Sequence, residues 1–470
     1  MERPACLVGS LTLALLWIEA IMPQGVFWLP AAFSILAGGV WWLFHHRLTG
    51  VCWAAAGVLS VLLCWTAPDG PACLQPEQTV QIQAVVQESS YRHSLLLVQQ
   101  VNDKATRFYA TAKGLPRLEP GTRLAAHVTM HSLDEPSHVQ QRAKGVYWQV
   151  QAHSGTVQTM GFYPPGAMQQ LRTRMAYHLR HGLTPEIGGV LCAMLLGQRE
   201  AIPKPLYRAY QSAGIPHVLV VSGLHLAVLC SLLHKDLTTE KKALRYAMGC
   251  ILIVILFVPM AGAESSLLRA GMAVLFSSVA IWIGGHSDPF TSLALSGVLL
   301  SIGRPALVWS LSFQLSVCAT AGILLGAACV RKLPPPPGGK WTRALWGDLR
   351  QQVILSLLAT LFVMPVQALW GLPVRLIGVA SNLIVFLLLK PILVGGLIAA
   401  LTGGIPLLDP IYHLARLVSS GLVGLLNQIT EAMAGFGTVP PAENRLWVGS
   451  CAVLLIICLV VRMHWEQQDP

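Results

Sequence analysis

The sequence predicts a polytopic α-helical membrane protein with a small extracytoplasmic all-β domain, of the OB type, inserted after its N-terminal helices. Three observations predict this class. Only 11% of the 470 residues are charged and 54% are hydrophobic, whereas soluble domains carry about 25% charged residues. Apolar runs near the ~20 residues of a spanning helix recur along most of the chain. Between residues 71 and 161 they give way to the period-two alternation of strands.

The N-terminal segment, residues 1–67, is expected to cross the membrane three times. Its apolar runs cover residues 6–22, 27–44 and 51–65. We interpret the first run as a retained helix, because only Arg3 precedes it and no clear cleavage site follows. Arg47 follows the second run. The positive-inside rule therefore places that loop in the cytoplasm and the chain beyond Pro68 outside.

Residues 71–161 form the predicted extracytoplasmic domain. Five strand candidates separated by turn residues favour a small closed barrel of the OB type. Such barrels often bind single-stranded nucleic acid through basic and aromatic residues, for which Arg92, Arg107 and Lys113 are the candidates. Eight Lys/Arg against six Asp/Glu leave a net charge of only +2. A plain solvated surface therefore explains each of these residues equally well. Cys64 and Cys73 are a candidate pair in an oxidising compartment.

Residues 165–435 form a predicted helical domain, and residues 446–470 a C-terminal transmembrane helix with a short tail. The first part, residues 167–210, is amphipathic, which is typical of interfacial helices. Its basic residues are suited to contact phosphates, although a role in topology alone explains them too; they include Arg172, Arg174, Arg199 and Arg208. Further spanning or near-spanning candidates cover residues 243–261, 265–284, 290–302, 306–330, 353–370, 376–389, 392–401 and 446–461.

The stretch from Gly214 to Leu229, GIPHVLVVSGLHLAVL, is apolar enough for a membrane helix. It nevertheless carries Ser222, Gly223 and His225 in its middle. Polar groups in hydrocarbon need an internal partner or cost several kcal/mol, so they are functional candidates. On a helix Ser222 and His225 share one face. They either line a pathway or form interhelical hydrogen bonds, which are common in membrane bundles.

Several blocks resemble one family. AGIPHVLVVSGLHL resembles the signature of ComEC-type competence proteins, the inner-membrane channel family that carries single-stranded DNA into naturally transformable bacteria. Other blocks resemble this family in the same order, and these are LLGQREAIP, AESSLLRAGM, DPFTSLALSGVLL, RPALVWSLSFQLSVCATAGI and MPVQALWGLPVRLIGVASNLIVFLLLKP. The resemblance implies a multi-pass channel of the cytoplasmic membrane that imports single-stranded DNA during natural transformation. The implied partners are single-stranded DNA, membrane lipids, an extracellular DNA receptor and a cytoplasmic ATP-driven translocase.

Many members of that family continue into a metallo-β-lactamase-like nuclease, which would need an H-x-H-x-D-H metal cluster. This sequence reaches Pro470 without such a cluster. We therefore expect no metal, no cofactor and no enzymatic activity, and a separate nuclease as a further partner. No Walker A pattern occurs either, so the energy for transport has to come from another protein.

The candidate pathway residues can equally be helix-packing residues; they are His217, Ser222, Gly223, His225, Glu264, Arg269, Phe313, Gln314 and Asn382. Glu264 and Arg269 are five residues apart at a helix start, which suggests an ion pair or a phosphate contact; snorkelling at the interface is the alternative. Phe313 is suited to stack on a base and Gln314 to form a hydrogen bond with it. Such a pair more often packs in the core and forms interhelical hydrogen bonds. Asn382 is costly in mid-helix unless it is paired.

Two other functions remain open from the sequence. The closeness of Ser222 and His225 suggests an intramembrane serine hydrolase, but no G-x-S-x-G motif is present. A small-solute or lipid permease would explain the helices and would need no extracellular barrel. The net charge of +11 fits both a protein that handles polyanions and a membrane protein with basic cytoplasmic loops.

Overall fold

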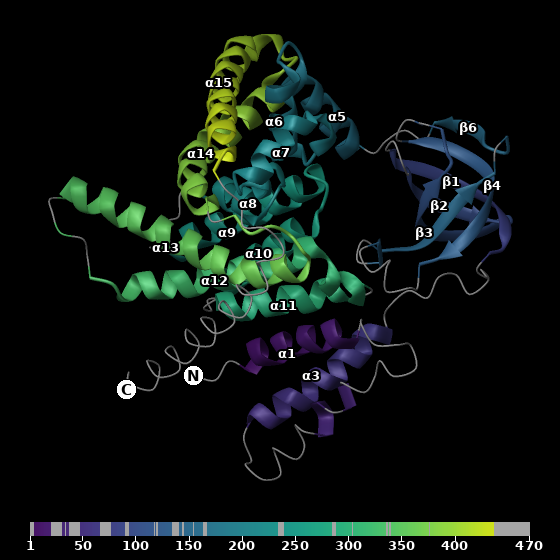
Figure 1. Ribbon diagram of the computed structural model, residues 1–470, viewed down its shortest axis with the longest axis horizontal. Helices are drawn as coiled ribbons and strands as arrows, with labels where there is room; N and C mark the ends of the chain where they lie inside the picture. The colour runs from purple at the N-terminus through teal and green to yellow at the C-terminus, as the bar shows by residue number, and fades with distance from the viewer. Residues whose placement is uncertain are drawn as a thin grey trace. The chain divides into compact units, whose positions relative to one another are not determined.

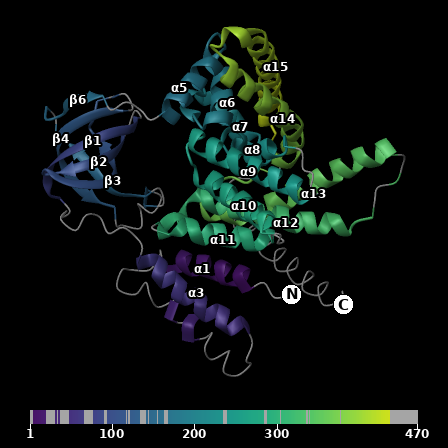
Figure 2. The same ribbon diagram turned by 180° about the vertical axis from the view of Figure 1, so that it is seen from behind.

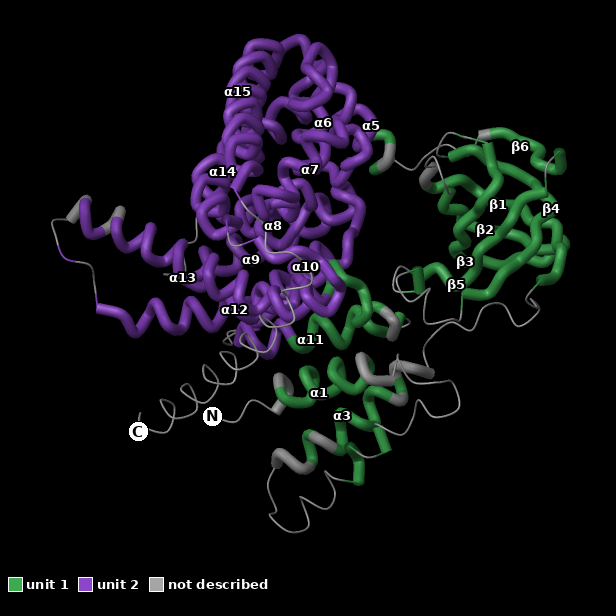
Figure 3. Tube along the Cα trace, in the orientation of Figure 1, with its two compact units in different colours: residues 1–170, 294–313 green, residues 171–293, 314–470 purple. Residues whose placement is uncertain are grey.

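The computed structural model covers the whole chain. It describes residues 4–19, 31–32, 34–36, 48–65, 77–89, 94–116, 118, 121–133, 141–142, 145–153, 155–162, 167–233, 239–283, 288–302, 304–334, 337, 340–375 and 377–436. The chain divides into two compact units, which Figure 3 distinguishes by colour. One unit comprises residues 1–170 and 294–313, and the other comprises residues 171–293 and 314–470.

The first unit contains a six-stranded β sheet that closes into a barrel. Its strands are β1 (Thr79–Ser89), β2 (Ser94–Val101), β3 (Lys104–Lys113), β4 (Thr122–Ser132), β5 (Val146–Ala152) and β6 (Gln158–Phe162). The order β1-β2-β3-β5-β4 returns to β1, because β1 also pairs with β4. The β3–β5 pair is parallel, and the other pairs are antiparallel. An all-β region after the first helices is thus confirmed.

Alternating side chains fill the barrel interior. Val80, Ile82 and Ala84 of β1 are buried, and Ile82 and Ala84 lie opposite Ala126 and Leu124 of β4. One face of each strand therefore forms the core, as the period-two pattern predicts. All five predicted strands are present, and a sixth was missed. The sixth strand, QTMGF, lacks this alternation, and its Met160 is exposed.

Each half of β4 has a different neighbour along one edge. Residues 128–132 pair with β5, and residues 122–125 pair with β6. On the other edge, β1 pairs with residues 123–129. β6 therefore covers the part of β4 that the shorter β5 does not reach.

Two N-terminal helices belong to the same unit: α1 (Pro4–Glu19) and α3 (Leu48–Trp65). α11 (Pro289–Ser301) packs on α1, where a Cβ added to Gly9 would lie 2.9 Å from the Cβ of Ala294. A 3-10 turn, η4 (Pro305–Trp309), follows α11. The second predicted run, residues 27–44, lies largely outside the described residues, and so does Cys73 of the suggested cysteine pair.

The second unit is helical, and two of its helices begin in the first unit, at residues 167 and 311. Its elements are α5 (Ala167–Arg180), α6 (Pro185–Leu196), η2 (Arg199–Ala201), α7 (Lys204–Ser212), η3 (Pro216–Leu219), α8 (Gly223–Cys230), α9 (Glu240–Met260), α10 (Ser265–Trp282), α12 (Leu311–Lys332), α13 (Lys340–Leu369), α14 (Gly378–Thr402), η5 (Pro406–Leu408) and α15 (Asp409–Ala434). α14 and α15 lie side by side, as the opposite views of Figures 1 and 2 both show. Residues 188–196 of α6 are buried within the protein.

Five described helices are long and apolar enough to cross a membrane. They are Glu240–Met260, Ser265–Trp282, Leu311–Lys332, Trp346–Leu369 and Gly378–Thr402. The chain is therefore mostly helical with several candidate spans, as predicted. The separate runs predicted at residues 376–389 and 392–401 form one helix, because α14 continues through Pro391. A proline removes one helical hydrogen bond, and packed neighbours make this tolerable. The predicted helix at residues 446–461 lies outside the described residues.

Candidate functional site

The stretch from Gly214 to Leu229 is not one continuous membrane helix, so that prediction was wrong. The α-helical structure is interrupted over residues 213–222, which are called the break. α7 ends at Ser212, η3 spans Pro216–Leu219, Val220 and Ser222 are extended, and α8 starts at Gly223. Gly214 has a φ of +76°, a conformation that favours glycine. The run is uniformly apolar, so its hydropathy gave no sign of the break.

The start of α14 anchors this break. A Cβ added to Gly214 would lie only 2.8 Å from the Cα of Gly378. The hydroxyl of Ser381 donates to the carbonyl of Ala213 at 2.8 Å. Two backbones thus approach directly at a glycine pair, as small residues allow in helix packing.

Ser222 and His225 form a local hydrogen-bonded cap at the start of α8. The backbone N–H of Ser222 donates to His225 Nδ1 at 3.3 Å, and the Ser222 Oγ lies 3.1 Å from the same nitrogen. This is a capping box with histidine in the place of the usual Glu or Gln. Because Nδ1 accepts, a neutral ring carries its proton on Nε2. Nε2 is buried and has no side-chain hydrogen-bond partner among the described residues, and a backbone hydrogen bond joins the imidazole to Val218.

A second pair of polar side chains, those of Asn382 and His217, lies near the N-terminal end of the break. The Nδ2 of Asn382 donates to the Ser356 Oγ at 3.0 Å, which links α14 to α13. A side-chain hydrogen bond also joins Asn382 to His217 in η3. The cost of a mid-helix Asn is thus offset by partners on two neighbouring elements.

Arg269 of α10 is almost fully buried, with 4% of its surface exposed. Its Nε donates to the Ser316 Oγ at 3.0 Å, and its Nη2 donates to the Thr320 Oγ1 at 2.9 Å. Both partners are neutral hydroxyls of α12, and in the described part of the chain no carboxylate pairs with this guanidinium. Its positive charge is therefore buried without compensation, which is costly in a protein interior.

Arg269 also lies beside the start of α8. A Cβ added to Gly223 would be 3.8 Å from the Nη2 of Arg269 and 2.9 Å from the Cβ of Ala270. Only a residue without a side chain fits here without displacing α10. The break therefore meets polar side chains from α13 and α14 at one end and from α10 at the other.

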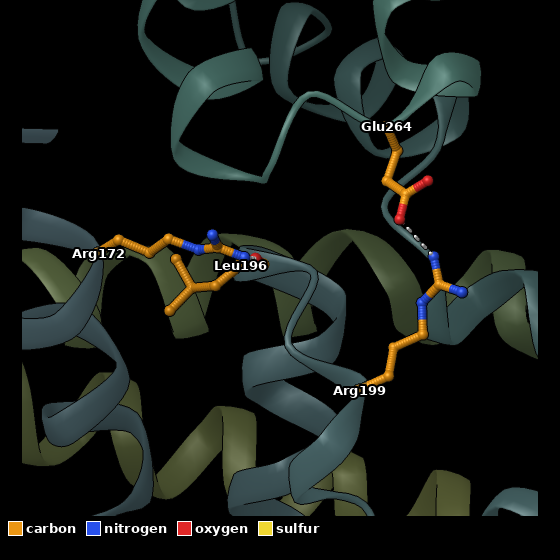
Figure 4. A network of polar contacts seen from close by, with 4 residues as sticks. All are labelled: Arg172, Leu196, Arg199 and Glu264. Carbon is orange, nitrogen blue, oxygen red and sulfur yellow. Dashed lines mark hydrogen bonds and ion pairs between the residues drawn. The ribbon is translucent and has the colours of Figure 1, made fainter. Parts of the chain in front are cut away.

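The expected pairing of Glu264 with Arg269 was wrong. Glu264 pairs with Arg199 of η2 instead, at 3.3 Å (Figure 4). Residues that share a helix face are three or four apart, and Glu264 precedes the first helical residue of α10 in an extended conformation. Its side chain therefore leaves the helix in another direction from that of Arg269.

Figure 4 shows a second arginine in this network, where the Nη2 of Arg172 donates to the carbonyl of Leu196 at 2.7 Å. A Cβ added to Gly262 would lie 3.3 Å from the same nitrogen. The α9–α10 loop and the end of α6 are thus held together by arginines. Because the side chains of Arg199 and Glu264 are 33% and 42% exposed, their ion pair stabilises the fold by about 0–1 kcal/mol.

Other candidate residues are not brought to the break. Phe313 is buried in the first unit, near Gly297. Gln314 accepts a hydrogen bond from the Trp370 Nε1 at 2.8 Å in the second unit. Packing and interhelical hydrogen bonding account for this pair. Exposed side chains are found at Arg107, Lys113, Arg174 and Arg208, and Arg92 lies outside the described residues.

Tyr147 of β5 is a half-buried phenol. Burial raises the pKa of the Tyr147 hydroxyl, and the positive charges of Arg142 and Arg304 oppose this shift. The hydroxyl has no hydrogen-bond partner among the described residues. Arg304 lies close to Gly145, at 3.1 Å from the position of an added Cβ.

Three hydroxyl residues at the site were missed in the sequence: Ser316, Thr320 and Ser356. Serine and threonine commonly bond to their own helix backbone in membrane segments, so composition does not single them out. Ser316 and Thr320 are four apart in SFQLSVCAT, which places them on one face of α12. In the described part of the chain, no group of three or more His, Cys, Asp and Glu side chains is placed to hold a metal ion.

Comparison with known proteins places this geometry in context. ComE operon protein 3 of Bacillus subtilis (strain 168) is 23% identical over 301 residues, which cover 61% of this chain and 36% of the relative. The match thus spans about a third of that protein. No solved structure matches the chain. The family model described as Competence protein matches residues 194–466, which is more than half of the sequence and includes the broken segment, so this chain belongs to the Competence protein family.

Proposed function

We propose that this protein is a multi-pass conduit of the cytoplasmic membrane that imports single-stranded DNA during natural transformation. One observation carries the proposal. The segment that resembles the family signature is interrupted by non-helical backbone, among helices long enough to span a membrane, and polar side chains lie at both ends of this break. Arg269 lies at one end, and Asn382 with His217 at the other. Irregular backbone at membrane depth is tolerated only where protein buries it or where it lines a pathway.

The barrel supports the proposal. A closed ring of five short strands matches the OB type, whose members often bind single strands. Strand β3 carries Arg107 and Lys113 six residues apart, on the same exposed face. In this proposal the barrel lies on the extracytoplasmic side and receives the strand before it reaches the helices.

Three partners complete the proposed pathway. An extracellular receptor delivers the DNA, a cytoplasmic ATP-driven translocase pulls the strand, and a separate nuclease degrades its complement. In this proposal the chain itself is not an enzyme. Lipids surround the apolar faces of the candidate spans.

One observation favours the alternative of an intramembrane serine hydrolase, namely the 3.1 Å contact between the Ser222 Oγ and His225 Nδ1. The same nitrogen also accepts the Ser222 backbone N–H, as expected of a helix cap. In the described part of the chain, no side chain hydrogen-bonds to Nε2 to orient the ring as a base. We therefore assign this pair to the start of α8 and not to catalysis.

The test follows labelled DNA in a naturally transformable host whose copy of this gene is deleted. Deletion is expected to leave the DNA outside the cytoplasm, and the wild-type gene is expected to restore entry. Asn382→Leu, which removes the polar link at the break, should restore less entry at equal protein level. Arg245→Gln, an exposed arginine of α9, is the matched control. Entry that is unaffected by deletion would refute the DNA assignment and favour the permease.

A further inference from the structure

We propose that the start of α8 and the guanidinium of Arg269 together hold one phosphodiester group of the passing strand. This inference rests on the proposed function for the source of the anion. The site itself is defined by residues that no comparison assigns.

Arg269 is nearly fully buried, and two of its five N–H groups bond to neutral hydroxyls. In the described structure no carboxylate faces it. A buried guanidinium in this setting stabilises an anion strongly, because charge-assisted hydrogen bonds gain strength where water is excluded. The hydroxyls of α12 fix its orientation and leave its other N–H groups for a ligand.

The N–H groups of Gly223 and Leu224 have no partner in the described structure, since the first hydrogen bonds of α8 come from His225 and Leu226. Unpaired N–H groups at a helix start carry a partial positive charge and bind anions. In broken membrane helices, such ends point at the anionic groups of substrates.

Arg269 Nη2 is 3.8 Å from the position of a Cβ on Gly223, so two positive groups meet with no negative group described between them. Ser222 and Gly223 are half-buried, and Leu224 is 38% exposed. The first turn of α8 is therefore partly exposed, whereas Arg269 beside it is buried.

A phosphodiester fits this pair of donors. It carries a single negative charge, which one guanidinium balances, and it has two free oxygens. One oxygen can accept from the α8 N–H groups while the other accepts from Arg269. Neither contact reads a base, so every nucleotide of a passing strand can occupy the site in turn. A single such contact is also weak enough to release the strand.

The test measures binding of a fluorescein-labelled dT12 strand by anisotropy. The full chain is held in nanodiscs of phosphatidylcholine, a lipid without net charge. A dT12 strand with a methylphosphonate backbone serves as the neutral probe. Arg269→Gln is expected to weaken binding of the charged strand about tenfold, as loss of one charge-assisted contact implies. Binding of the neutral strand should stay unchanged, and the salt dependence should fall by about one phosphate contact.

A second variant tests the same site if Arg269→Gln lowers the melting temperature of the protein. Leu224→Pro removes one N–H donor from the first turn of α8, where proline is tolerated, and should weaken charged-strand binding about threefold. Arg245→Gln, remote in sequence and exposed, is the control and should change little. Equal losses for Arg269→Gln and Arg245→Gln, or a parallel loss for the neutral strand, would overturn the site.

The conduit and the anion site can be refuted separately. If deletion leaves DNA entry unchanged but Arg269→Gln selectively weakens charged-strand binding, the anion site stands and the conduit is refuted. If entry depends on the chain but the charged strand binds Arg269→Gln as it binds wild type, the conduit stands and the site is refuted. A wild-type chain that binds neither strand also refutes the site.

Discussion

The turn at Gly214 offers a direct test of how the broken segment is held. Gly214→Ala places a Cβ in a backbone conformation with a φ of +76°, about 2.8 Å from the Cα of Gly378. The left-handed conformation costs about 1–2 kcal/mol for a residue with a Cβ. Displacing a backbone neighbour adds about 1–3 kcal/mol of overpacking. The total expected destabilisation is therefore about 2–5 kcal/mol.

Gly371 provides the matched control. Its φ is +63°, and nothing lies within 4 Å of an added Cβ. Gly371→Ala should therefore cost only the conformational part, about 1–2 kcal/mol. The difference between the two variants isolates the close approach of Gly214 to α14.

The assay is thermal unfolding of the purified full chain in detergent, followed by intrinsic tryptophan fluorescence at one scan rate. Gly214→Ala should melt several degrees below Gly371→Ala, since about 1 kcal/mol shifts a domain of this size by a few degrees. Equal melting temperatures for the two variants would show that α14 does not hold the turn in place.

Three further predictions concern polar groups. A double-mutant cycle of Arg199→Gln and Glu264→Gln should give a coupling below about 1 kcal/mol, because both side chains are partly exposed; a coupling above about 2 kcal/mol would contradict this. Asn382→Ala should lower the free energy of unfolding by about 0.6–1.7 kcal/mol, the range of polar contacts between membrane helices. Ser356→Ala should lower the unfolding temperature by as much as Asn382→Ala does if the bond between the two side chains is the cause. Burial raises the pKa of Tyr147, so stability from its neutral form is present below about pH 10 and is lost as pH rises through the raised value. Tyr147→Phe should therefore flatten the loss of stability in that alkaline range, and an unchanged profile would exclude Tyr147 as its source.

The sequence predicted those elements whose periodicity is set by one dominant interaction. Val80, Ile82 and Ala84 alternate because they face the barrel core, and the long apolar helices stand out because hydrocarbon demands them. β6 was missed because its side chains do not alternate, and its pairing depends on the free part of the β4 edge. Such tertiary context is absent from a local pattern.

The site was predicted by residue type but not by arrangement. Ser222, His225, Arg269 and Asn382 were singled out because polar groups are rare in apolar runs. Their partners were not foreseeable, since Ser316 lies 47 residues from Arg269 along the chain. Nor was the break, because a positive φ at Gly214 and its close approach to Gly378 leave no trace in hydropathy.

The parallel pairing of β3 with β5 also constrains how the barrel is made. β5 is synthesised after β4, yet it has to insert between β3 and β4 to close the ring. Until residue 152 has emerged, β1 to β4 can pair only as an open sheet with two free edges. Free edges attract other strands, and closures between distant segments are slow. A chain stalled or truncated before Val146 should therefore be prone to association with other nascent chains, whereas one that extends beyond Phe162 has both edges of β4 covered.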